Sequence, residues 1–127
     1  MVAGAVDYGG YDVTFASGAA VSQYGCVKIG SADMTVIQTA ADTDISVGFA
    51  QTAATASGEY VEVRHYGVTR AIASGAISRG TRVAPDASGK VKTAATGDQV
   101  CGIALEAAGA NNDLIRVLIE RSVDIIA

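Results

Sequence analysis

The sequence is poor in the residues that build catalytic and metal sites. His65 is the only histidine, so any Ser-His-Asp or Cys-His arrangement would have to use it. We expect it to be a surface histidine at the end of a strand. A single histidine also excludes a multi-histidine zinc site, and Cys26 and Cys101 are too far apart for a CxxC motif. We therefore predict that the protein is not an enzyme and uses no metal or other cofactor.

The two cysteines leave one question open. Cys26 and Cys101 could form a disulfide only if the fold brings them together. Otherwise both are buried free thiols in a reduced compartment, which is the state we expect.

Long apolar runs and basic clusters are also missing. No stretch approaches the roughly 20 apolar residues of a membrane-spanning helix. The N-terminus lacks the basic and apolar regions of a signal peptide, so we expect a soluble protein made in the cytosol. Nine Lys and Arg residues are scattered among 13 Asp and Glu residues, for a net charge of −4. Neither nucleic acid nor a membrane is therefore an expected partner.

The acidic and glycine-rich segments do not form recognisable binding loops. A calcium loop needs several carboxylates converging in a short stretch, but the sequence offers only Asp42 and Asp44. An aspartate that bonds to its own backbone in a turn explains Asp44 and Asp98 better. Residues 4–10 lack the Lys-Ser/Thr pair and the following helix of a phosphate-binding loop.

What the sequence does contain is an internal repeat. The pattern T-A-A-x-x-D-x-x-x-G-x-A-x-x-A-A begins at Thr39 and returns without a gap at Thr93, 54 residues later. Chance matching of abundant Ala, Gly and Thr is the alternative, but the matches include Asp and Gly at equal spacing. We predict two copies of one β unit, at about 16–66 and 73–121, within a single domain of residues 16–127.

Hydrophobic periodicity predicts β-strands throughout the chain. Alternation in 115–121 places Ile115, Val117 and Ile119 on one face, and 61–64 follows the same pattern. The segment 85–90 fits a tight hairpin, because proline fixes φ and glycine supplies a positive φ. Short strands separated by such turns indicate an all-β fold, a small sandwich or barrel.

The two ends of the chain have no counterpart in the repeat. Residues 1–15 are predicted to form an extended N-terminal arm, whose last three residues could add a strand to its own sheet or to a neighbour's. A frayed terminus is the alternative. The tail is too apolar for solvent and is expected to pack on the domain or on a partner subunit. The candidate contacts with other protein chains in these two segments are Val13, Thr14, Phe15, Ile125 and Ile126.

Two motifs in the second repeat resemble a known family. Residues 77–91 read I-x-x-G-x-x-V-x-x-D-x-x-G-K-V, and residues 96–108 read T-G-D-x-x-x-G-x-A-L-E-A-A. With these motifs the chain resembles the small capsid decoration (cement) proteins of tailed bacteriophages, most clearly over residues 74–119. It departs from the usual pattern in its longer N-terminal arm and its apolar tail.

The resemblance implies a fold, a location and partners. We expect a β-tulip or β-clip-like domain, made in the host cytoplasm and bound to the outer surface of an expanded icosahedral capsid. Such proteins commonly form homotrimers that bridge adjacent subunits of the major capsid protein, so the implied partners are that protein and further copies of this chain. A small β-barrel binding module that recognises a carbohydrate or a protein is the alternative function.

Overall fold

The computed structural model describes the backbone of residues 10–123 and the side chains of residues 10–121. This part of the chain contains nine strands and no helix, and so no helix long enough to cross a membrane. The predicted all-β fold is therefore confirmed. The strands are β1 (Gly10–Ser17), β2 (Cys26–Ile29), β3 (Thr35–Gln38), β4 (Gly48–Ala50), β5 (Tyr60–Ile72), β6 (Arg82–Pro85), β7 (Val91–Thr93), β8 (Gln99–Ala104) and β9 (Leu114–Val123).

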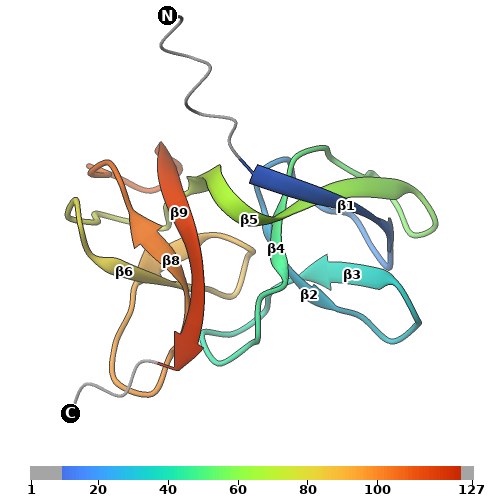
Figure 1. Ribbon diagram of the computed structural model, residues 1–127, viewed down its shortest axis with the longest axis horizontal. Coiled ribbons are helices and arrows are strands. Elements are labelled where there is room, and N and C mark those ends of the chain that lie inside the picture. The colour runs from blue at the N-terminus through green and yellow to red at the C-terminus, as the bar shows by residue number, and fades with distance from the viewer. Residues whose placement is uncertain (1–9, 124–127) are drawn as a thin grey trace, which may run out of the picture.

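The strands form one mixed sheet in the order β1-β3-β2-β4-β5-β9-β8-β6-β7. An additional pairing between β1 and β5 closes the first five of these into a small barrel, which we call the first ring. In Figure 1 the first ring lies on the right, and β6, β8 and β9 lie on the left. Within the first ring β1 runs parallel to β3, and the other pairings are antiparallel.

Strand β5 is shared by both halves of the molecule. Residues 60–67 pair with β1, and residues 68–72 pair with β9. Gly67 lies where the partner changes, and its φ of +100° would strain a residue with a side chain. Just after β5, a parallel bridge joins Ala73 to Val91 at the start of β7. This bridge connects the two ends of the series β5-β9-β8-β6-β7, which we call the second ring.

The two rings make the same pairings at corresponding positions. Ala50 lies opposite Val63 in the first ring, and the residues 54 positions later, Ala104 and Val117, lie opposite each other in the second. These equivalences support the proposal that the chain consists of two copies of one β unit. The isolated antiparallel bridges Val21–Ala54 and Ile77–Ala108 also correspond, with Ala108 54 positions after Ala54 and Ile77 56 positions after Val21.

Each ring is filled mainly by small aliphatic side chains. Valine suits these inward positions because its β-branched side chain is stiff and packs well on a pleated strand. Phe49 is the largest fully buried side chain. Phe49 and Cys26 belong to strands of the first ring, but their side chains point out of it and pack in the core cluster of the second ring. These two residues therefore join the rings. The inward valines are Val27, Val36, Val61 and Val63 in the first ring and Val83, Val91 and Val117 in the second.

The predicted aspartate turns are confirmed. The Oδ2 atom of Asp44 accepts hydrogen bonds from the backbone N–H groups of Ala40 and Ala41, at 2.7 and 3.0 Å. The Oδ2 atom of Asp98 accepts one from Ala95 at 2.8 Å. Both carboxylates therefore satisfy their own turns. Within residues 10–121, no three His, Cys, Asp or Glu side chains are grouped to hold a metal ion.

The predicted hairpin at 85–90 is also confirmed, and it joins β6 to β7. The backbone N–H of Asp86 donates to the carbonyl of Lys90 at 2.8 Å. Gly89 adopts a φ of +73°, the left-handed conformation that this turn needs.

Candidate interaction surfaces

His65 and the two cysteines are the residues that any Ser-His-Asp or Cys-His arrangement would have to use. His65 lies inside β5 and not at a strand end as predicted, because β5 continues through Gly67 to Ile72. Cys26 and Cys101 are free thiols in one buried cluster. Burial raises the pKa of the Cys101 thiol, and the neighbouring Cys26 thiol raises it further. A buried thiol that stays protonated at neutral pH is a poor nucleophile.

Residues 13–15 lie in β1, which adds to the chain's own sheet through β5. The side chain of Phe15 packs against the core of the first ring, and the Thr14 hydroxyl donates a hydrogen bond to the Glu62 carboxylate. Val13 is the most exposed apolar side chain of the three, at 36%. On its other side, β1 pairs with β3 only at Ala16 and Ser17. Among the described strands, none pairs with that second edge of residues 10–15.

Ile125 and Ile126 lie outside the described residues, as do residues 1–9 of the predicted arm. Near the C-terminal end of β9, a side chain of this strand contacts the backbone of the first ring. There the Nη1 atom of Arg121 donates to the carbonyl oxygens of Val47 and His65, at 3.4 and 3.2 Å. These bonds bring the start of the tail close to both rings.

Exposed aromatic side chains gather where β1 begins. Tyr11 and Tyr66 stack with ring centroids 5.6 Å apart, and they are 66% and 62% exposed. Beside them, the Asp12 carboxylate accepts two hydrogen bonds from the Arg64 guanidinium, at 2.8 and 3.3 Å. Tyrosine and arginine are enriched at protein interfaces, so this corner is one candidate contact.

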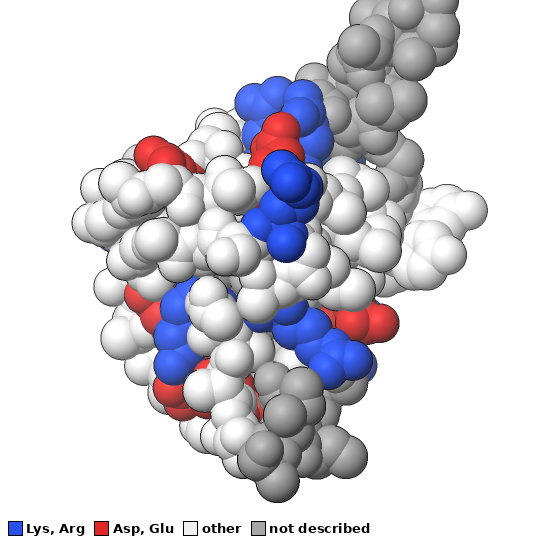
Figure 2. All heavy atoms as spheres, turned by 90° about the vertical axis from the view of Figure 1, so that its left-hand side faces the viewer, with Lys and Arg blue, Asp and Glu red and all other residues white. Residues whose placement is uncertain are grey.

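The outward side of the second ring is more apolar than strand alternation requires. Thr69 on β5 and Val117 on β9 lie opposite each other and point inward. The residues just before and after each of them on the same strand therefore point outward. Among the outward residues, Leu114 is 45% exposed and Leu118 is 39% exposed. Figure 2, drawn from the side of β6, β8 and β9, shows a mostly uncharged surface with both basic and acidic side chains scattered over it. The arginine–leucine face, as we name it, consists of Val68, Arg70, Ile72, Ile103, Leu114, Arg116 and Leu118.

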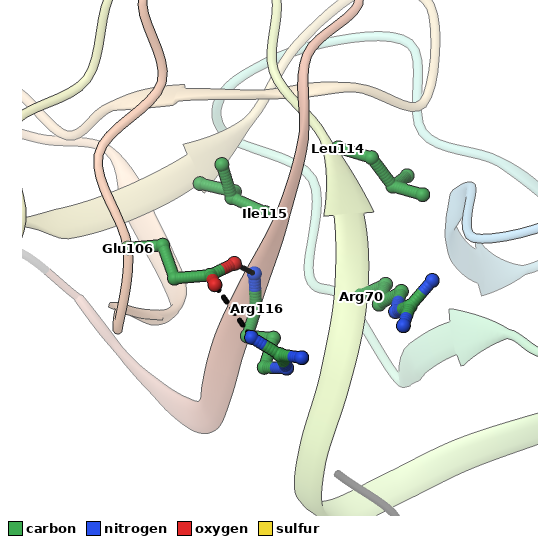
Figure 3. Close-up of a pocket in the computed structure, with 5 residues that line it drawn as sticks. All are labelled: Arg70, Glu106, Leu114, Ile115 and Arg116. Carbon is green, nitrogen blue, oxygen red and sulfur yellow. Dashed lines mark hydrogen bonds and ion pairs between the residues drawn. The ribbon is translucent and has the colours of Figure 1, made fainter. Parts of the chain in front are cut away.

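Two arginines lie directly opposite each other in this face, Arg70 on β5 and Arg116 on β9 (Figure 3). Like charges in such cross-strand positions repel. Glu106 offsets part of this charge, because its carboxylate accepts hydrogen bonds from the backbone N–H of Arg116 at 2.9 Å and from its guanidinium at 2.5 Å. The three side chains line a hollow of about 190 Å³ together with Leu114 and Ile115. The residues that line the hollow thus include two guanidinium groups and one carboxylate.

A second hollow, of about 430 Å³, lies on the first ring. Ile29 and Ile45 border it and are 53% and 68% exposed. On its rim, Lys28 Nζ lies 3.0 Å from Asp44 Oδ2. Burial acts to raise the pKa of Asp44, but the hydrogen bond from the backbone of Ala40 and the Lys28 ammonium outweigh it and lower the pKa. We call this feature the isoleucine hollow, and it is lined by Lys28, Ile29, Thr43, Asp44, Ile45 and Val47.

The sequence prediction did not identify the arginine–leucine face. The strand alternation was predicted correctly, since Ile115 and Val117 are buried and Ile119 is partly buried. The overlooked signal was Leu118, an aliphatic residue on the face that alternation assigns to solvent. Only its position between Val68 and Ile103 in the sheet shows that it belongs to a larger apolar surface.

Comparisons with known proteins agree with this architecture. A family model described as "Phage cement protein" matches residues 6–119. Among curated proteins, none matches the chain. The crystal structure of the head fiber gp8.5 N base in bacteriophage phi29 is similar in fold, with a TM-score of 0.71 and 21% sequence identity. That similarity covers 89% of this chain and 96% of the other.

Proposed function

The chain belongs to the phage cement protein family, and from this membership we propose that it stabilises the expanded capsid by bridging subunits of the major capsid protein. As a cement protein it is a structural component of the virion at the outer surface of the capsid. Such a role is structural and needs no catalytic group. We further propose that the protein acts as a homotrimer.

The isoleucine hollow is the observation that carries the proposal of a capsid contact. Large side chains such as Ile29 and Ile45 are costly to leave in water, and contiguous exposed apolar surface marks sites of protein interaction. The Lys28–Asp44 ion pair on its rim supplies polar groups of both signs at the edge of this surface. An apolar centre with a polar rim is the composition of a specific interface.

Stabilisation of the shell follows from mass action. A protein that binds only the expanded shell lowers the free energy of that state by its binding free energy, about 2.7 kcal/mol per site at a concentration 100-fold above Kd. A trimer that contacts several capsid subunits at once gains avidity, so each contact can be modest. This is why small surfaces such as the isoleucine hollow are sufficient.

The open edge of β1 supports a second contact. One edge of residues 10–15 pairs with β5. The backbone N–H and C=O groups on the opposite edge pair with no described strand. Such an edge can accept an extended segment of another chain. The proposed contacts at Val13, Thr14 and Phe15 would then use backbone hydrogen bonds together with the exposed Val13 side chain. Ile125 and Ile126 remain proposed contacts on the basis of sequence alone.

The direct test is to add the purified protein to expanded heads that lack it. We expect saturable binding and a rise in the temperature or osmotic shock at which the heads open. Ile45→Asp should reduce this binding at least tenfold, because it puts a charge into the isoleucine hollow. Ala87→Asp, which adds the same charge at the exposed hairpin of residues 85–90, serves as the matched control.

Two outcomes would contradict the proposal. A wild-type protein that binds heads without changing their resistance does not act as cement. Equal binding by Ile45→Asp and Ala87→Asp would remove the isoleucine hollow from the contact. Electron cryomicroscopy of the decorated particle would then show which surface meets the shell.

A further inference from the structure

The repeated architecture provides an internal comparison for the arginine–leucine face. The outward residues of β1 and β5 in the first ring occupy the same places as those of β5 and β9 in the second. In the first ring most are polar, so the fold itself does not require aliphatic side chains there. The outward pairs are Asp12–Arg64, Thr14–Glu62 and Ala16–Tyr60 in the first ring, and Val68–Leu118, Arg70–Arg116 and Ile72–Leu114 in the second.

The next outward pair of the first ring, beside Arg64 in the sheet, is covered by another part of the molecule. Cys26 and Phe49 are paired across β2 and β4 and are fully buried, because the second ring packs on them. The corresponding pair in the second ring is Arg82 and Ile103, across β6 and β8. Arg82 is exposed and Ile103 is only partly buried. Among residues 10–121, therefore, nothing covers the second ring where the first ring is covered by another β unit.

The distribution of charge indicates the chemistry of the missing partner. Residues 1–66 carry seven acidic and two basic side chains, whereas residues 67–127 carry six acidic and seven basic ones. The arginine–leucine face lies in the basic half and contributes two arginines. The outward side of the first ring carries Glu62 beside Tyr60, which is 74% exposed. With Asp12, Glu62 and Arg64, the first-ring surface carries one more acidic than basic side chain. This surface and its exposed aromatic side chain complement an aliphatic surface that carries two arginines.

We propose that the arginine–leucine face of one copy binds the outward β1–β5 surface of the first ring of a second copy, head to tail. The proposal deepens the homotrimer proposed above and rests on it. A head-to-tail contact uses two different surfaces on each chain, and it closes into a ring when the rotation between copies allows. Three copies related in this way would bury three identical contacts and leave no arginine–leucine face exposed.

Light scattering after size-exclusion chromatography tests the contact. The wild type should have a mass that is a multiple of its 12.8 kDa chain, three chains for a closed trimer. Leu118→Asp disrupts the arginine–leucine face, and Glu62→Lys reverses the charge of the first-ring surface. Each variant alone should be monomeric. Mixed together they should form a one-to-one dimer, because each still carries the surface that the other lacks.

Controls separate this contact from folding and from capsid binding. Circular dichroism must show that the monomeric variants keep the wild-type spectrum, and Leu114→Asp provides a second variant if Leu118→Asp unfolds. Ile45→Asp, on the isoleucine hollow, should keep the wild-type mass. A wild type that is monomeric, a Leu118→Asp protein that keeps the wild-type mass, or two monomeric variants that do not combine would each overturn the inference.

The inference and the proposed function can fail separately. If Leu118→Asp keeps the oligomer but no longer decorates heads, its face meets the shell and not a second copy, so the inference is wrong while cementing stands. If the variants behave as expected but the wild type does not strengthen heads, the head-to-tail contact stands and the proposed function is wrong.

Discussion

Asp98 repeats in the second ring the interaction that Asp44 makes in the first. Each Oδ2 atom accepts a hydrogen bond from the backbone N–H three residues earlier, from Ala41 at 3.0 Å and from Ala95 at 2.8 Å. Each carboxylate also lies near a lysine ammonium, Lys28 at 3.0 Å and Lys92 at 3.5 Å. The two turns are therefore held by the same combination of hydrogen bonds and opposite charge.

This interaction makes stability depend on pH. Hydrogen bonds and Lys28 lower the pKa of Asp44 in the folded state despite the opposing effect of burial. The unfolded state then binds the proton more readily, so this contribution is complete above the usual pKa of about 3.9 and is lost as pH falls through the lower folded value. Asp44→Asn should cost about 1 kcal/mol at pH 7 and reduce the loss of stability at low pH.

Urea denaturation at pH 7 and at a series of values down to pH 2.5 measures both effects. Thr43→Ala, at the exposed neighbouring position, is the control and should follow the wild-type pH profile. An Asp44→Asn protein whose stability falls as steeply with acid as the wild type would show that other carboxylates dominate the pH dependence.

A glycine repeated at positions 48 and 102 is required by close packing. A Cβ atom on Gly102 would overlap Cγ1 of Val117 and the carbonyl oxygen of Leu118, and one on Gly48 would overlap the carbonyl of Arg64. Gly102→Ala should therefore destabilise the protein by about 1–3 kcal/mol, because the strands must move apart. Gly75→Ala is the matched control, since nothing lies within 4 Å of its added methyl group. Equal unfolding midpoints for the two variants would contradict the close approach of β8 and β9.

The two cysteines should be unreactive in the folded protein. Cys26 is 0% and Cys101 is 1% exposed, and burial raises the pKa of the Cys101 thiol. Alkylation by iodoacetamide at pH 7.5, followed by mass spectrometry, should be at least 100-fold slower in buffer than in urea. An Ala87→Cys variant, exposed in the hairpin, should gain one rapidly alkylated site. Rapid labelling of Cys26 or Cys101 in the folded wild type would show that the junction between the rings opens.

Local patterns in the sequence predicted the local parts of this fold. The alternation around Ile115 and Val117 and the aspartate turn at Asp98 depend on neighbouring residues, so a single sequence shows them. The role of β5 in both rings depends on pairings with β1 and β9, which lie far away in sequence. The sequence predicted that a strand ends near His65, whereas the positive φ of Gly67 allows the strand to continue toward a new partner.

The candidate surfaces were less predictable for the same reason. The exposure of Leu118 follows from alternation, but its neighbours in the arginine–leucine face come from β5 and β8. The isoleucine hollow likewise combines Ile29 at the end of β2 with Ile45 in the segment before β4. A surface assembled from separate strands appears only when the register between those strands is known.

The predicted arm can be tested without disturbing the sheet. Strand β1 begins at Gly10, and its pairing with β5 runs from Gly10 to Ala16. Deletion of residues 1–9 should therefore leave the unfolding midpoint nearly unchanged, whereas deletion of residues 1–15 should unfold the first ring, because it removes Phe15 from the core. If the arm contacts the shell, the shorter deletion should weaken binding to expanded heads while the mass of the oligomer stays the same. Wild-type binding by the protein that lacks residues 1–9 would remove the arm from the mechanism and leave the folded surfaces to make the contact.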